Sequence, residues 1–188
     1  MTTTNRLFAC AGLAFACAFA ACGGPHASAA AATPAANGVE RGRYLVNIIG
    51  CGDCHTPKKM GPNGPEPDTA RELSGHPEQM KLPAPPALSG PWAVAVSGDM
   101  TVWKGPWGVS FSANLTPEQN TGLGIWTADM FVKAMRNGKH MGVSRPILPP
   151  MPWQNFGRMS DDDLQAIYAY LRTLKPIVNH VPDPVMSH

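Results

Sequence analysis

The sequence predicts a single domain that is mostly α-helical, with a few short helices joined by long loops. Three stretches show the apolar spacing of amphipathic helices, at residues 39–49, 127–138 and 160–175. The chain also holds 19 glycines and 20 prolines among 188 residues, which favours turns and loops elsewhere. A Cys-x-x-Cys-His motif follows the first helical stretch, and it is the candidate functional site around which the loops are expected to fold.

This motif, Cys51-Gly52-Asp53-Cys54-His55, has the attachment pattern of a c-type haem. Two thiols can add to the two vinyl groups of one porphyrin, because the two-residue spacer lets both sulfurs face the same edge of the ring. The adjacent histidine can then bind the iron as its proximal ligand. We therefore predict one covalent haem c, held by Cys51, Cys54 and His55.

A Cys-x-x-Cys pair alone is less specific, because zinc knuckles and thioredoxin-like dithiols share it. A zinc site would need two more Cys or His ligands at short spacing, and none follows. A dithiol site would normally end a strand and open a helix of a βαβ unit, which the Pro/Gly-rich sequence after His55 does not suggest. The haem interpretation is favoured over both.

Residues 1–21 have the features of an export signal. Arg6 is their one charge, and the apolar run up to Ala21 is short for a membrane span. Residues 19–22 resemble a bacterial lipobox, with Phe in place of the usual Leu, so cleavage would leave Cys22 as a lipidated N-terminus. The alternatives are cleavage near residues 27–29 and an uncleaved anchor.

The other boundaries follow from composition. Residues 22–38 predict a flexible tether, residues 39–182 the haem domain and residues 183–188 a tail. Cys10 and Cys17 leave with the signal, so no thiol remains for a disulfide in the oxidising periplasm. A formal net charge of +2 and the lack of a basic run argue against a nucleic-acid partner.

The first helix leads directly into the motif. Gly42 would permit a close crossing with another helix, and Gly50 ends the helix just before Cys51. The apolar side chains predicted to share its buried face are Tyr44, Leu45, Ile48 and Ile49.

A proximal histidine needs an acceptor for its other ring nitrogen, often a backbone carbonyl. The turn-forming sequence after His55 offers proline carbonyls, which a fixed φ orients. We predict Pro62 in this role, with Pro57 as the alternative.

Residues 64–113 are long and irregular. His76 is more typical of a loop residue than of a ligand. The candidates for short strands or for the wall of the haem site are Val94, Val96, Val102 and Phe111. The tryptophans predicted to pack in the core or against the haem, with an exposed partner surface as the alternative, are Trp92, Trp103 and Trp107.

The two later helices carry capping signals. Thr127 caps the second helix and Gly138 closes it. Ser160 caps the third helix with Asp163 in a capping-box pattern, and Pro176 stops it.

The loop between these helices places Met151 among prolines. The prolines fix φ and remove backbone donors, so the loop is stiff and can present a thioether at a fixed distance. Because Met/His ligation marks electron-transfer cytochromes, Met151 is the predicted distal ligand. The competing ligands are His140, Met141 and Met159. Trp153, in the same motif, is predicted as a further haem contact.

Residues 39–182 resemble class I mono-haem c-type cytochrome domains, in the order helix, C-x-x-C-H, irregular loops, helix, Pro-Pro-Met-Pro and terminal helix. The nearest likeness is to the cytochrome domains of bacterial membrane-associated dehydrogenases of the alcohol and gluconate type. The residues that carry it are Cys51–Pro57, Leu73–Gly75, Asn114–Pro117, Thr121–Trp126, Met151–Trp153 and Asp163–Leu171.

The resemblance implies a cytochrome c-like fold, thioethers at Cys51 and Cys54, and axial ligands His55 and Met151. It also implies that the first and last helices cross near Gly42, Tyr44 and Tyr170. Those dehydrogenase subunits carry three C-x-x-C-H motifs whereas this chain has one, so it is not a multi-haem wire.

We therefore expect a one-electron carrier and not an enzyme. Its predicted partners are a periplasmic or membrane-bound dehydrogenase and a terminal oxidase or other respiratory component. Its predicted location is the periplasmic side of a bacterial membrane, held through lipid on Cys22 or otherwise soluble. The alternatives are a fixed subunit of a dehydrogenase complex and a haem enzyme or gas sensor with a displaceable methionine.

Overall fold

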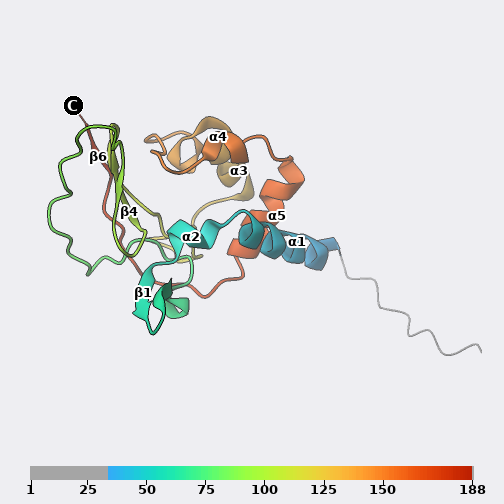
Figure 1. Ribbon diagram of the computed structural model, residues 1–188. Helices are drawn as coiled ribbons and strands as arrows, with labels where there is room; N and C mark the ends of the chain where they lie inside the picture. Colours follow the sequence, from blue (N-terminus) through green and yellow to red (C-terminus); the bar gives the residue numbers. More distant parts are fainter. Residues whose placement is uncertain (1–33, 188) are drawn as a thin grey trace, which may run out of the picture. The chain divides into compact units, whose positions relative to one another are not determined.

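The computed structural model of the protein describes residues 34–187. The predicted export signal, the lipid site at Cys22 and most of the predicted tether lie outside these residues. Within them the chain forms five α-helices and two antiparallel sheets (Figure 1). No helix in this part of the chain is both long and apolar enough to cross a membrane.

The three predicted helices are present, with shifted ends. The α-helices are α1 (Pro34–Ile48), α2 (Cys51–His55), α3 (Ala128–Asn137), α4 (Trp153–Phe156) and α5 (Asp161–Leu171). Helix α1 begins at Pro34, inside the predicted tether, and α5 ends at Leu171, before Pro176 stops the chain from continuing as helix. The short helix α2 holds the Cys-x-x-Cys-His motif, and α4 lies in the segment predicted as a loop between the two later helices.

The capping predictions are confirmed. The side chain of Thr127 accepts a hydrogen bond from the Met130 N–H, and Gly138 ends α3 with a φ of 62°. The Ser160 hydroxyl accepts from the Asp163 N–H at the start of α5. These contacts satisfy backbone groups that a helix end leaves without partners.

Helices α1 and α5 cross closely, as predicted (Figure 1). A Cβ on Gly42 would overlap the Ala166 carbonyl and come within 2.9 Å of the Tyr170 Cβ. The ion pair between Arg41 and Asp163, at 2.9 Å, links the two helices beside the crossing.

The predicted buried face of α1 is partly wrong. Leu45 is buried, but Tyr44 and Ile48 are exposed, and Val46 is buried in their place. Gly42, Leu45 and Val46 belong to an i, i+3, i+4 stripe, the geometry that a helix needs to pack along a partner. The close approach at Gly42 therefore selects the buried face.

The crossing gives a direct test of α1 packing. We expect Gly42→Ala to lower the free energy of unfolding by about 1–3 kcal/mol, because the added methyl overpacks against the α5 backbone. Gly38 is the matched control, since it lies in the same helix and a Cβ there would meet nothing within 4 Å. Gly38→Ala should stabilise the helix by up to about 1 kcal/mol. Denaturant unfolding would contradict the packing argument if both variants gained stability.

The strands correct the mostly α-helical prediction. A hairpin of β1 (Lys58–Gly61) and β2 (Gly64–Pro67) follows α2. A four-stranded antiparallel sheet has the order β3-β4-β5-β6, from Ala95–Val96, Val102–Gly105, Gly108–Phe111 and Val185–Met186. Short 3-10 helices cover Thr69–Arg71 and His140–Gly142. Glycine-containing stretches that look like loops in the sequence therefore form antiparallel strands, which pair with each other across tight turns.

The last strand also corrects the predicted tail. Val185 and Met186 pair with β5, so residues 183–187 return to the sheet (Figure 1, the red strand beside the green ones). The buried apolar core lies instead between the helices and the loops that pack on them. Its members are Leu45, Val46, Leu73, Leu123, Phe131, Ala134, Met135, Leu164, Ile167 and Leu171.

Candidate functional site

A cavity of about 560 Å³ brings the predicted site residues together. Cys51, Cys54, His55 and Met151 all line it, although Met151 is remote from the other three in sequence. The volume lies within the roughly 300–1,000 Å³ typical of ligand and cofactor sites. The walls come from α2, from the end of β5, from the loops before and after α3, from α5 itself and from the C-terminal segment.

Helix α2 explains why the motif residues face the same way. Gly50, with a φ of 72°, turns the chain between α1 and α2. Cys51, Cys54 and His55 then stand at i, i+3 and i+4, which places them on one face of a single helical turn. The short helix therefore presents two thiols and one imidazole to the same cavity.

The acceptor of His55 differs from the prediction. Its Nδ1 donates to the carbonyl of Ala113 at 2.8 Å. Pro62 is an exposed residue of the β1–β2 turn, and the Pro57 carbonyl accepts from the Asp68 N–H instead, so both proline predictions are wrong. The acceptor lies 58 residues away in sequence, where no local turn signal could reveal it.

Burial sets the protonation of the motif residues. Burial lowers the pKa of His55, with the Ala113 carbonyl acting in the opposite sense, so the neutral imidazole that metal binding requires is favoured. Burial also raises the pKa of the Cys51 thiol to about 11 and raises that of Cys54.

These thiols do not suit the two competing interpretations of the motif. A redox dithiol depends on a lowered thiol pKa, whereas both thiols here have raised values. Across residues 34–187, no three His, Cys, Asp or Glu side chains form a group able to hold a metal ion. A zinc site therefore lacks its ligands in the part of the chain that the structure describes.

The Met151 loop is held at both ends. The Ser110 hydroxyl of β5 donates to the Pro149 carbonyl at 2.6 Å. On the other side, the indole of Trp153 lies against Gly138, where a Cβ would overlap it. Trp153 thus supports the loop and is not among the residues that line the cavity, and its contact with a haem stays a prediction.

The alternatives for the distal ligand narrow to two. His140 lines the cavity together with Met151, whereas Met141 and Met159 do not. The His140 ring stands edge-on to Trp126, with 5.0 Å between ring centroids. Burial lowers the pKa of His140, and the charge of nearby Arg145 lowers it further.

Trp103 adds a polar group that sequence reasoning had not singled out from the other tryptophans. It lines the cavity, and its buried indole N–H has no hydrogen-bond partner among the described residues. A buried donor without an acceptor is costly, so a bound group with an acceptor oxygen is expected to meet it. By contrast, Trp92 is 75% exposed and lies outside both the core and this cavity.

These residues fit a haem c. The cavity offers two thiols on one helical face, an imidazole held by its Nδ1, and a thioether from a supported loop. Trp103 adds a donor suited to a carboxylate, the polar group at the porphyrin edge. The C-terminal residues that also line the cavity, which no sequence signal indicated, are His180, Val181, Asp183 and Pro184.

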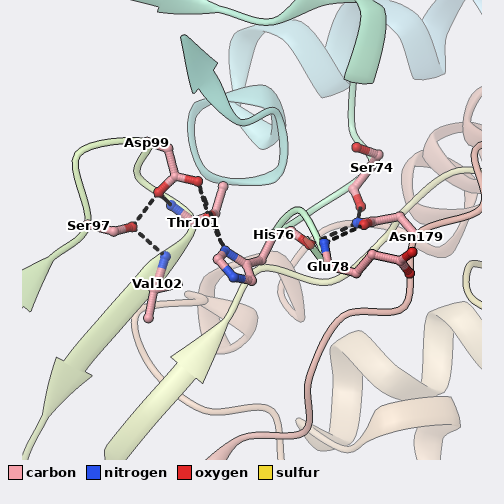
Figure 2. A network of polar contacts seen from close by, with 8 residues as sticks. All are labelled: Ser74, His76, Glu78, Ser97, Asp99, Thr101, Val102 and Asn179. Atoms are coloured by element: carbon pink, nitrogen blue, oxygen red, sulfur yellow. Dashed lines mark hydrogen bonds and ion pairs between the residues drawn. The ribbon is translucent and has the colours of Figure 1, made fainter. Parts of the chain in front are cut away.

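His76 does not line the cavity. It is 3% exposed, and its Nδ1 lies 2.7 Å from the Thr101 hydroxyl in a buried polar network (Figure 2). His76 lies in a loop, as predicted, and this loop residue is buried.

Comparison with known proteins bears on the same site. No protein-family model matches the chain. An alcohol dehydrogenase (quinone) cytochrome c subunit from Gluconobacter oxydans (strain 621H) is 29% identical over 148 residues, which are 77% of this chain and 24% of the relative. A fructose dehydrogenase cytochrome subunit from Gluconobacter japonicus is 28% identical over 140 residues, 74% of this chain and 22% of the relative.

A shorter match has higher identity. The gluconate 2-dehydrogenase cytochrome c subunit from Pantoea cypripedii is 39% identical over 57 residues, 30% of this chain and 13% of the relative. The chain spans a quarter or less of the length of these relatives. The resemblance to cytochrome c subunits of dehydrogenases, predicted from the motifs, is confirmed by this similarity.

Proposed function

We propose that this chain is a mono-haem c-type cytochrome that carries one electron at a time on behalf of a dehydrogenase. The observation that carries the proposal is the shared cavity, lined by both motif cysteines, His55 and Met151. The similarity to cytochrome c subunits of dehydrogenases supports it independently.

When bound, a haem c supplies a one-electron ferrous/ferric couple. Cys51 and Cys54 would hold it through thioethers, and His55 and Met151 would bind its iron. The Ala113 carbonyl fixes the plane and tautomer of the His55 ring, which leaves Nε2 as the ligand atom. The Trp103 N–H would donate to a carboxylate of the bound group.

The protein environment favours the reduced state. A methionine ligand raises the reduction potential. The apolar side chains in the cavity wall, such as Phe111, Phe131 and Leu164, disfavour the additional positive charge of the ferric form. His55 and Met151 would both be ligands of the iron, which would leave a substrate without a place on it and suits an electron carrier and not an enzyme.

The partner and location are proposed from the relatives and the N-terminal sequence. Because the relatives are dehydrogenase subunits, the electron donor is a periplasmic or membrane-bound dehydrogenase, and a terminal oxidase or another respiratory component is the acceptor. The lipobox-like sequence at Cys22 supports a lipid anchor on the periplasmic face of the membrane.

Spectroscopy of the purified holoprotein tests the function. We expect one haem per chain, a reversible one-electron titration, and a sulfur-to-iron charge-transfer band in the red region of the ferric spectrum. The reduced protein should not take up carbon monoxide unless a ligand is displaced. Absence of haem would refute the proposal, and ready carbon monoxide binding would favour the gas sensor or haem enzyme.

A second experiment separates a free shuttle from a fixed subunit. The similarity to subunits that are several times longer favours a partner-bound role for this domain. Affinity purification of the full chain from its native membrane, after mild detergent, should then retain a stoichiometric dehydrogenase subunit. A free shuttle would elute alone.

A further inference from the structure

His55 is held by two chain segments that come from distant parts of the sequence. Its backbone carbonyl accepts from the Gly75 N–H at 2.8 Å, and its ring Nδ1 donates to the Ala113 carbonyl at 2.8 Å. The orientation of the proximal imidazole therefore depends on how residues 73–76 and 111–115 are fixed to each other.

These two segments are hydrogen-bonded to one another on both sides of the His55 contacts. The His76 N–H donates to the Ser112 carbonyl at 2.9 Å, and the Leu115 N–H donates to the Leu73 carbonyl at 2.8 Å. The Ser112 N–H donates in turn to the Thr101 carbonyl at 2.9 Å. Ser112, the neighbour of Ala113, thus joins His76 to Thr101 through its backbone.

The side chain of His76 closes the same connection (Figure 2). Its Nδ1 lies 2.7 Å from the Thr101 hydroxyl, and that hydroxyl donates to Asp99 Oδ2 at 2.5 Å. Because the single hydroxyl proton goes to the carboxylate, the hydroxyl accepts from the His76 Nδ1–H. Asp99 also accepts from the Ser97 hydroxyl at 2.5 Å.

Packing and a second polar side chain hold His76 in place. Its ring lies against Phe111, with 5.3 Å between ring centroids, and Phe111 lines the haem cavity. Asn179 donates to the backbone carbonyls of Ser74 and His76 at 2.6 and 2.9 Å. The buried imidazole thus contacts both the cavity wall and the segment that precedes Ala113.

We propose that His76 is a positioning residue for the proximal ligand, and that it acts through Thr101 and Asp99 to hold the Ala113 carbonyl against the His55 ring. An apolar side chain would fill the same volume without the cost of burying a polar ring. The polar side chains of His76, Thr101 and Asp99 are instead all hydrogen-bonded to one another in sequence. His76 is the neighbour of Gly75, and it bonds the neighbour of Ala113; these are the two residues that hold His55. This inference rests on the proposed haem function.

The consequence is electronic as well as geometric. A firm hydrogen bond to Nδ1 raises the basicity of a metal-bound imidazole and so favours the ferric state. Loosening the Ala113 carbonyl should therefore raise the reduction potential and expose the His55 Nδ1–H to solvent exchange.

Two substitutions remove the connection in different ways. His76→Phe keeps a ring against Phe111 but removes the donor, and Thr101→Val removes the hydroxyl at nearly constant volume. On the ferrous holoprotein, we expect NMR to show roughly tenfold faster exchange of the His55 Nδ1–H in both variants, as for one lost buried hydrogen bond. His76→Phe should also raise the midpoint potential.

Two further variants separate positioning from packing. His76→Asn keeps an N–H donor near the Nδ1 position and should restore the exchange rate and potential of the unmodified protein. Thr127→Val is the control of the same substitution type, because the Thr127 hydroxyl accepts from the Met130 N–H within the first turn of α3, and Thr127 neither lines the cavity nor belongs to the two segments that hold His55. It should lower thermal stability without altering either signal of His55.

The results are distinguishable from a failure of the proposed function. If the unmodified protein holds no haem, the proposed function is lost and this inference with it. If it holds haem but His76→Phe and Thr101→Val behave like Thr127→Val, the positioning role is overturned and the function stands. Should His76→Phe not fold, the exchange rate in Thr101→Val decides.

Discussion

Replacing Met151 by alanine is expected to abolish the sulfur-to-iron charge-transfer band of the ferric protein. The thioether is the proposed source of this band, and its loss leaves the iron without its weak axial donor. The midpoint potential should fall by on the order of 0.1 V, within the roughly 0.8 V range over which axial ligands set haem potentials. The reduced variant should bind carbon monoxide directly, because the sixth position is then open.

Met159→Ala is the control for this change. Met159 packs against the core but does not line the cavity, so its loss should cost stability and leave the band in place. If Met151→Ala keeps the band, the distal assignment is wrong. If the unmodified protein lacks the band and His140→Ala opens the sixth position, His140 is the ligand.

The double substitution Cys51→Ala/Cys54→Ala is expected to eliminate all covalently bound haem. Both thiols face the cavity from one turn of α2, and residues 34–187 contain no other cysteine to replace them. Haem should then be absent from the denatured polypeptide on a gel stained for haem peroxidase activity. Each single variant should keep one thioether and therefore part of the stain.

Asp53→Ala controls for damage to the helical turn itself. Asp53 is exposed and lies between the two cysteines, so its variant should retain the full covalent stain. Loss of stain in Asp53→Ala would show that the maturation of the motif, and not the thiols, limits attachment. Retention of covalent haem in the double variant would contradict the thioether assignment.

Local chemistry made much of this protein predictable. The Cys-x-x-Cys-His spacing puts its three functional atoms on one helical face whatever the rest of the chain does. The caps at Thr127 and Ser160 act within one turn, and they were placed correctly from residue type alone. Met151 was singled out because prolines stiffen a loop locally.

The errors share a physical cause. The acceptor of His55 does not lie in the following turn but is Ala113, two residues after β5 ends and far along the chain. The buried face of α1 differs from the predicted one because the close contact of Gly42 with α5, and not the hydrophobicity of the side chains, decides which face of α1 packs. The C-terminal residues were predicted as a tail because a two-residue strand such as Val185–Met186 has no periodic signal of its own.

Residue types and their spacing alone thus determined which motif side chains share the cavity and where α3 and α5 begin. Those properties depend on bonds and contacts between near neighbours. Tertiary structure decided which carbonyl orients the imidazole, which faces are buried, and that Trp103 and the C-terminal segment enclose the cavity. Such contacts form between segments far apart in the chain, and the free energy of the whole packed arrangement selects them.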